Sequence, residues 1–279
     1  PEEIKIFGGL DDLKDTVTSV RVNPKSPYKV DLQDGKLQLF CLDKPIAEVC
    51  YHPVPEFYNR PLHSGKSMGE IAPVIEWGYL VYLTVYRLCQ YFNKEEQCQF
   101  CDLNKNYKQQ RQAGRSYTGV KSVDEIIEAL SWISQDDKQV ISEAITITGG
   151  AILQPLRGED EVSFYSKYAN AIKERFGDRW ILKAVVQAFE YSDVERLHES
   201  GFDIYHPNFE VWDENLFPKV CPGKERFIGR NGWISRVVDS AEIFGPANVI
   251  PNFVGGVEMN RNYGFSEVEP AIASTSEGL

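Results

Sequence analysis

The sequence predicts an α/β fold in which parallel strands alternate with helices, as in a parallel (β/α) barrel or partial TIM barrel. The chain has 279 residues, 42% of them hydrophobic, which is enough for one large core. From Tyr79 onward, short apolar segments alternate with segments of helical pattern. Parallel strands need such crossovers, because a tight turn cannot join two neighbouring strands that run in the same direction.

Residues 1–78 lack this alternation and predict a separate N-terminal extension. Lys36–Leu42 and Ile46–Tyr51 have the composition of short strands, and turn residues lie between them. We therefore expect a small β-hairpin there, followed by a core at residues 79–279. The chain ends after a fifth predicted helix, so we expect the barrel to be incomplete at its C-terminal end.

Five strands and five helices are expected in the core. The strands are apolar runs at 79–86, 144–148, 180–187, 202–206 and 248–254. The helices are expected at 122–135, 159–177, 192–201, 231–245 and 265–278. In folds of this class the chemistry lies at the carboxyl ends of the strands, so the loops after the strands hold the candidate residues.

Charge and hydropathy exclude several classes of partner. The net charge is -11 and the isoelectric point about 5.0, which disfavours a broad surface for nucleic acid or anionic lipid. The longest apolar stretch, 79–86, is well short of the roughly 20 residues that a spanning helix needs. The first ten residues have no signal-peptide pattern. We expect a cytoplasmic protein with neither a nucleic-acid nor a membrane partner.

Three of the six cysteines lie together after the first core strand, in a C-x8-C-x2-C pattern at Cys89, Cys98 and Cys101. In a reducing compartment, clustered thiols indicate a metal site. A structural zinc ion needs a fourth ligand, such as Cys221 or His206. A [4Fe-4S] cluster with three protein thiolates leaves one iron open to a small molecule. The three cysteines alone leave both alternatives open.

The segments LTVYRLCQYFNKEEQCQFCDLN and ITITGGAIL together resemble the radical S-adenosylmethionine (SAM) superfamily. Members carry three cysteines after the first barrel strand, usually as C-x3-C-x-aromatic-C. Here Phe100 keeps the aromatic position before Cys101, whereas the first gap is eight residues long. The resemblance implies that Cys89, Cys98 and Cys101 bind a [4Fe-4S] cluster.

The same resemblance implies residues that bind SAM. Thr148, Gly149 and Gly150 match the glycine-rich segment whose backbone holds the methionyl amino group, although Ala151 stands where the family often has an acidic residue. The later segments look most like the biotin synthase branch. They imply Asn208 and Glu210 at the ribose, Arg236 at the SAM carboxylate, and Val254 and Glu258 in the segment that passes the adenine.

The remaining candidates rest on position alone. Glu190 follows the third core strand, so we expect it to face SAM or the substrate. Cys41 and Cys50 are candidates for a second metal site, and Cys221 for a radical relay or an auxiliary ligand. Their ordinary roles as buried or loop cysteines stay open.

The resemblance implies a radical SAM enzyme. Its cluster would cleave SAM reductively to a 5′-deoxyadenosyl radical, which abstracts hydrogen from an unidentified small-molecule substrate. It implies an oxygen-sensitive protein, an electron donor such as flavodoxin or ferredoxin, and no particular downstream reaction. The alternatives are a structural zinc protein and an iron–sulfur electron carrier without SAM chemistry. An electron carrier would have a fourth thiolate on its cluster, and it would have no role for Asn208, Glu210 and Arg236.

Overall fold

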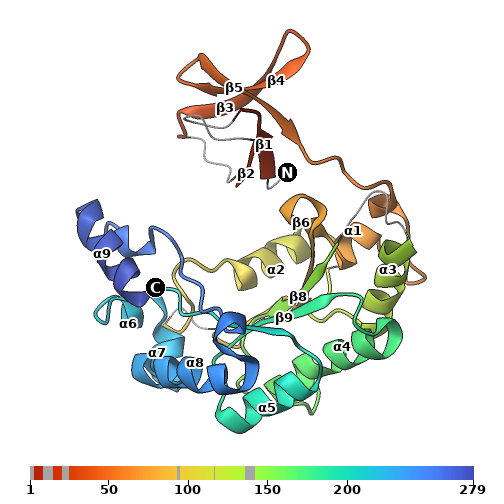
Figure 1. Ribbon diagram of the computed structural model, residues 1–279, viewed down its shortest axis with the longest axis vertical. Coiled ribbons are helices and arrows are strands. Elements are labelled where there is room, and N and C mark those ends of the chain that lie inside the picture. Colours follow the sequence, from red (N-terminus) through yellow and green to blue (C-terminus); the bar gives the residue numbers. More distant parts are fainter. Residues whose placement is uncertain (1–2, 9–14, 21–24, 93–94, 116, 136–141) are drawn as a thin grey trace. The chain divides into compact units, whose positions relative to one another are not determined.

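The computed structural model describes residues 3–8, 15–20, 25–92, 95–115, 117–135 and 142–279 (Figure 1). The chain forms two compact units. The first contains Pro1–Val81 and Ala129–Glu143, and the second contains Tyr82–Glu128 and Ala144–Leu279. All the residues of the candidate site belong to the second unit.

The first unit contains an antiparallel sheet of order β2-β1-β5-β4-β3. Its strands are β1 (Glu3–Ile6), β2 (Thr16–Ser19), β3 (Tyr28–Gln33), β4 (Lys36–Cys41) and β5 (Lys44–Tyr51). Ile4, Ile6, Leu39 and Val49 form its buried cluster. The predicted hairpin is therefore present as β4 and β5, within a larger sheet.

Short elements follow this sheet in the chain. They are η1 (Glu56–Asn59), α1 (Met68–Ile71), β6 (Val74–Ile75) and η2 (Glu76–Gly78). Glu76 and Trp77 have left-handed backbone angles, with φ of 52° and 55°. The Glu3 carboxylate accepts hydrogen bonds from both of their backbone N–H groups, at 3.1 Å each, and so holds the turn.

A second sheet has the order β10-β9-β8-β7-β6. Its longer strands are β7 (Leu80–Tyr86), β8 (Ala144–Gly149), β9 (Ile181–Val186) and β10 (Ile204–Pro207). β8, β9 and β10 run parallel, whereas β6 pairs antiparallel with β7. The mixed α/β class with a parallel sheet is confirmed. The described strands do not form a closed barrel.

The strand expected at 248–254 is not a regular strand. The segment runs beside β10 and makes two isolated parallel bridges, Tyr205 with Val249 and Glu210 with Phe253. Its backbone N–H groups at Ile250 and Val254 donate to Tyr205 and Glu210, at 2.8 and 2.9 Å. The bridges are five residues apart from Tyr205 to Glu210 but four apart from Val249 to Phe253, and the N–H groups of residues 209 and 210 both donate to the carbonyl of residue 252. A bulge therefore interrupts the ladder.

All five predicted helices are present. They are α3 (Val123–Gln135), α4 (Glu161–Phe176), α5 (Tyr191–Glu199), α8 (Arg230–Phe244) and α9 (Val268–Gly278). The structure adds α2 (Leu103–Gln112), α6 (Phe217–Val220), α7 (Pro222–Phe227), η3 (Pro246–Asn248) and η4 (Val257–Met259). None of the helices in the described ranges is both long and apolar enough to cross a membrane.

The parallel strands place the candidate residues at one edge of the sheet. Because β8, β9 and β10 point the same way, their carboxyl ends lie together. Gly149, Gln187 and Asn208 stand at these three ends. Helix α4, whose Phe164, Tyr165 and Tyr168 are fully buried, contacts β8 and fixes this part of the core.

Candidate functional site

A cavity of about 140 Å³ lies at this edge. Cys89, Cys98 and Cys101 all line it, together with Phe100. The eight-residue gap in the motif therefore does not separate the thiols. The structure brings the three predicted ligands to one space.

The ends of two strands complete the cavity wall. Thr148, Gly149 and Gly150 line it from the end of β8, and Asn208 and Glu210 line it after β10. These are the residues that the resemblance implies for SAM. Their position beside the thiols is what a shared cluster and SAM site requires.

Asn104 in α2 ties the long cysteine loop back onto itself. Its Oδ1 accepts a hydrogen bond from the Cys89 N–H at 2.8 Å, and its Nδ2 donates to the Cys89 carbonyl at 3.1 Å. Asn104 is buried and lies three residues after Cys101 in the chain. One side chain therefore connects the two ends of the motif. Sequence reasoning missed it, because α2 has no apolar periodicity.

Gln90 connects the same loop to the loop after β8. Its Oε1 accepts hydrogen bonds from the N–H groups of Leu153 and Gln154, at 2.7 and 2.6 Å. Its backbone N–H donates to the Ala151 carbonyl at 2.9 Å. These hydrogen bonds within the protein fix the position of the cysteine loop relative to the glycine segment.

The two glycines allow this close contact. A Cβ on Gly150 would lie 2.1 Å from the Leu88 carbonyl oxygen and 2.4 Å from the Cys89 Cα. A Cβ on Gly149 would lie 2.6 Å from the Tyr86 carbonyl oxygen and from the Tyr165 hydroxyl. Any larger residue would move the backbone that carries Cys89. The glycines have a packing role here, beside the proposed contact with SAM.

The environments of the thiols differ. Burial raises the pKa of Cys89 to about 11, and burial also raises the pKa of Cys101. Cys98 behaves in the opposite way, because a hydrogen bond from Cys221 and the charge of Lys224 outweigh burial and lower its pKa. Cys221 is fully buried and, through the same hydrogen bond and burial, has a raised pKa.

Among the residues described, no three His, Cys, Asp or Glu side chains are grouped as ligands of one metal ion. Thiolates on one tetrahedral zinc, with bonds of about 2.3 Å, lie about 3.8 Å apart. In a [4Fe-4S] cluster each thiolate binds its own iron, so the sulfur atoms stand further apart.

A buried ion pair forms the opposite wall of the cavity. Lys224 Nζ donates to Glu210 Oε1 at 2.8 Å and to the Asn208 carbonyl at 2.6 Å. The two side chains are 9% and 11% exposed. Burial opposes the charge of Lys224, but Glu210 and then the two neighbouring thiols offset it and raise its pKa. The Trp233 ring, 4.4 Å from Nζ, adds a cation–π contact.

Replacing Lys224 by Met is expected to lower the free energy of unfolding by about 3–5 kcal/mol, because it leaves the Glu210 carboxylate buried without its cation. Urea unfolding of the cluster-free chain under anaerobic conditions measures this. Lys219→Met, at an exposed lysine of α6, is the control and should change it by about 0.5 kcal/mol or less. A loss below about 1 kcal/mol at Lys224 would contradict the prediction.

A row of polar side chains extends from Asn208 along the sheet edge. Asn252 Nδ2 donates to Asn208 Oδ1 at 2.9 Å and lies 3.1 Å from His206 Nδ1. Burial, with a smaller contribution from Lys183, lowers the pKa of His206 to about 4, so the ring is neutral. His206 does not line the cavity with the thiols.

Arg236 and Glu190 lie outside the thiol cavity. Arg236 forms an ion pair with Glu190 and donates to the Ala188 carbonyl at 2.9 Å. Arg236 lines a neighbouring cavity of about 350 Å³, and Glu161 and Gln187 line both cavities. The structure thus places Arg236 next to the thiol site, with a carboxylate partner already in contact.

Val254 and Glu258 have contacts within the protein. The Val254 N–H donates to the Glu210 carbonyl, so this segment is tied to the site by its backbone. Glu258 is 3% exposed and accepts hydrogen bonds from Ser274 and Thr275, at 2.8 and 3.1 Å. Its carboxylate thereby anchors helix α9. Neither residue is among those that line the two cavities.

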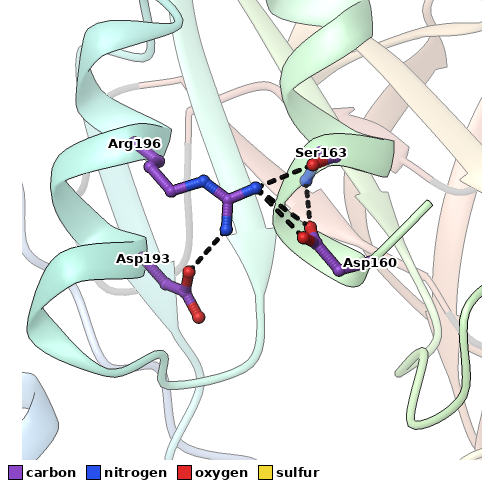
Figure 2. A network of polar contacts seen from close by, with 4 residues as sticks. All are labelled: Asp160, Ser163, Asp193 and Arg196. Carbon is purple, nitrogen blue, oxygen red and sulfur yellow. Dashed lines mark hydrogen bonds and ion pairs between the residues drawn. The ribbon is translucent and has the colours of Figure 1, made fainter.

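Figure 2 shows an ionic network on the rim of the larger cavity. Arg196 of α5 donates to Asp193 at 2.7 Å and reaches across to Asp160, whose oxygens are 3.1 and 3.2 Å away. Asp160 caps α4 by accepting from the Ser163 N–H at 2.7 Å. The network joins α4 to α5.

Cys41 and Cys50 are not brought together. Cys41 pairs with Lys44 at the turn end of the hairpin, whereas Cys50 pairs with Lys5 on β1. Cys50 is six positions after Lys44 on β5, a distance of about 20 Å along the strand. The second metal site considered for these two cysteines is not supported.

No protein-family model and no curated protein matches this chain. Among solved structures, this chain is similar to one whose title is "Crystal structure of methylornithine synthase (PylB)". The two sequences are 15% identical, the alignment covers 75% of this chain, and the TM-score is 0.46. The alignment covers 51% of the PylB chain, so the present chain spans about half the length of PylB. A likeness at this level carries no argument about function.

Proposed function

We propose that this chain is a radical SAM enzyme. One observation carries the proposal: the three thiols of the C-x8-C-x2-C motif share a cavity with the glycine segment after β8 and with Asn208 and Glu210 after β10. These segments are far apart in the sequence, and the same sequence resemblance implicates all of them. Their meeting in one cavity supports a single site for a [4Fe-4S] cluster and SAM.

In this proposal each wall of the cavity has a task. Cys89, Cys98 and Cys101 hold the cluster, and Phe100 covers it. Thr148, Gly149 and Gly150 present their backbone to the amino group of SAM. Asn208 and Glu210 bind the ribose, and the second oxygen of Glu210 is not used by Lys224.

The SAM carboxylate and the adenine are assigned to residues around the cavity. Arg236 binds the carboxylate as a bidentate partner, in exchange for the carboxylate of Glu190 with which it is paired in the structure. Val254 supports the adenine through the segment that is tied to Glu210. Glu258 acts through the same segment by anchoring it to α9.

When bound, the cluster supplies the electron that cleaves SAM into methionine and a 5′-deoxyadenosyl radical, which takes hydrogen from a small-molecule substrate. The chain's own share is to fix the thiols, orient SAM and keep water away. An electron donor such as flavodoxin or ferredoxin completes the proposal. The later steps of the reaction depend on a substrate that these residues do not specify.

The direct test is anaerobic reconstitution with iron and sulfide, followed by incubation with SAM and dithionite. We expect a brown protein and 5′-deoxyadenosine that increases with time. Protein without iron is the control and should form none. A fully loaded cluster that never cleaves SAM would contradict the proposal and favour an electron carrier.

Replacing Arg236 by Ala is expected to weaken SAM binding roughly 30-fold or more, because losing one partner of a desolvated charge pair costs about 2–5 kcal/mol. Titration of SAM into the reconstituted variant measures this, and the iron content should not change. Glu190→Gln is the matched variant, since it removes only the competing carboxylate and should bind SAM no more weakly than the unchanged chain. An unchanged dissociation constant for Arg236→Ala would show that Arg236 has a structural role and does not bind SAM.

One observation favours the electron carrier as a second candidate. Cys221 is hydrogen bonded to Cys98 and so supplies a fourth thiol next to the proposed ligands. A carrier would use it as the fourth thiolate and would have no open iron. Cys221→Ala separates the two functions: it should leave SAM cleavage in place in the enzyme and destabilise the cluster in the carrier.

A further inference from the structure

The larger cavity contains a carboxyl group with an unused oxygen. Glu161, the first residue of α4, is 7% exposed. Its Oε2 accepts hydrogen bonds from the Ile152 N–H at 3.1 Å and from Gln187 Nε2 at 2.6 Å. Its Oε1 is buried and has no hydrogen-bond partner within the described part of the chain. An unsatisfied buried oxygen is costly, so it calls for an explanation.

Glu161 stands between the two cavities. Glu161 and Gln187 line both the thiol cavity and the larger one. The Tyr91 hydroxyl donates to Gln187 Oε1 at 2.5 Å, which turns the amide nitrogen of Gln187 toward Glu161. A continuous set of hydrogen bonds therefore runs from the cysteine loop to this carboxyl group. A ligand that meets Glu161 in the larger cavity would lie next to the thiol site.

The other charged residues that line the larger cavity already have partners. Arg196 is held by Asp160 and Asp193 (Figure 2), and Arg236 is held by Glu190. The charged lining residues include three carboxyl groups and two guanidinium groups. In the structure both guanidinium groups are paired with carboxylates, whereas Glu161 has an open oxygen. The position beside Glu161 therefore suits a cationic group that donates a hydrogen bond.

Apolar side chains form part of the cavity wall, beside the amide of Gln187. Ile152, Val162, Phe189 and Ile228 line it, and its volume is about 350 Å³. That volume is in the range of small-molecule sites. An aliphatic body fits against these side chains, with its charged end at Glu161.

We propose that this cavity binds a small aliphatic molecule through a primary ammonium group, which donates a hydrogen bond to Glu161 Oε1. The terminal torsion of a glutamate is soft, so a small rotation presents this oxygen to the ligand. Identifying the ligand as the substrate rests on the proposed function. Binding of the amine does not, because it needs neither cluster nor SAM.

The protonation of Glu161 gives the binding a signature. Burial raises the pKa of Glu161 to about 8, so at pH 7 the group is mostly a neutral acid. Contact with an ammonium ion favours the carboxylate, and the acid proton leaves to solvent. Binding therefore releases about 0.9 proton per ligand at pH 7, given a pKa of about 8.

The neighbouring groups do not supply this proton. The charged groups around the cavity are Asp160, Asp193, Arg196 and Arg236, with Glu190 paired to Arg236. Hydrogen bonds with Ser163 and Arg196 lower the pKa of Asp160, and hydrogen bonds with Asp193 and Asp160 raise the pKa of Arg196, so neither group releases a proton near pH 7. Burial raises the pKa of the four tyrosines that are electrostatically coupled to Glu161, which are Tyr86, Tyr91, Tyr165 and Tyr205.

The test uses the 279-residue chain without a cluster, with n-butylammonium as the probe. Calorimetry at pH 7 in two buffers of different ionisation enthalpy gives both the affinity and the protons released. We expect saturable binding of n-butylammonium with about 0.9 proton released per ligand. The matched neutral and anionic probes, n-butanol and butyrate, should bind at least tenfold more weakly.

Glu161→Gln is expected to weaken n-butylammonium binding roughly 30-fold or more and to abolish the proton release. Glu195→Gln, at an exposed carboxylate of α5, is the control and should bind like the unchanged chain. Absence of binding, equal binding of n-butanol, or binding of the cation without proton release in the unchanged chain would each overturn the proposal. These results come from cluster-free protein, so they are independent of whether the chain cleaves SAM.

Discussion

Replacing Cys89, Cys98 and Cys101 together by alanine is expected to reduce the iron bound after anaerobic reconstitution from about four atoms per chain to near zero. The three thiols line one cavity, and they are the only cysteines among its lining residues. The thiolates are the ligands of the proposed cluster, so without them no iron is held. Iron and sulfide analysis of the reconstituted variant measures the change. SAM cleavage should be lost with the iron.

Two further cysteine variants make this result specific. The double variant Cys41→Ala and Cys50→Ala changes cysteines of the first unit, so it should keep about four irons. Cys221→Ala removes the hydrogen bond to Cys98 and should keep the cluster in the proposed enzyme. A triple variant of Cys89, Cys98 and Cys101 that still bound about four irons would refute the site.

Gly150→Ala is expected to cause the second large effect, a fall in bound iron to less than one atom per chain, because an intact cluster of about four irons can no longer be held. The added Cβ would lie 2.1 Å from the Leu88 carbonyl oxygen and 2.4 Å from the Cys89 Cα and Cβ. These are mostly backbone atoms, so the loop that carries Cys89 must move. Overpacking of this kind also costs about 1–3 kcal/mol of stability, which urea unfolding measures.

Gly255→Ala is the control for this effect. A Cβ at Gly255 would have no heavy atom within 4 Å, and its φ is not in the left-handed region. It should keep both the iron and the stability of the unchanged chain. If Gly150→Ala also kept its cluster, the register between the cysteine loop and the glycine segment would have no role in assembly.

The apolar pattern predicted the parallel part of the fold, and polar or exposed elements were missed. β8 is buried at five of its six positions, so its apolar run indicated a strand. β3 has the sequence YKVDLQ, is mostly exposed, and gave no such signal. Helix α2 was missed for the same reason. At 248–254 the apolar run predicted a strand, but a bulge opposite Asn252 interrupts the ladder.

Within the site, the sequence pointed to the groups proposed to bind and missed the groups that position them. The thiols, glycines, Asn208 and Glu210 were recognisable from motifs. Asn104 and Lys224 were not, because their roles arise from contacts to residues 14 to 16 positions away. The pairing of Arg236 with Glu190, 46 positions apart, was equally invisible. Such contacts depend on the fold and leave no local spacing pattern.

The hydrogen bonds that Asn104 and Gln90 make to the cysteine loop have a consequence for maintenance of the site. They join protein to protein and involve no thiol, so they persist when the thiols are empty. The backbone around Cys89 therefore loses its conformational entropy when the chain folds, and this loss does not weaken metal binding. In the proposed enzyme, a cluster destroyed by oxygen would be rebuilt on a Cys89 backbone that is still in place. Repair would then require iron, sulfide and a reductant, and no refolding of this part of the chain.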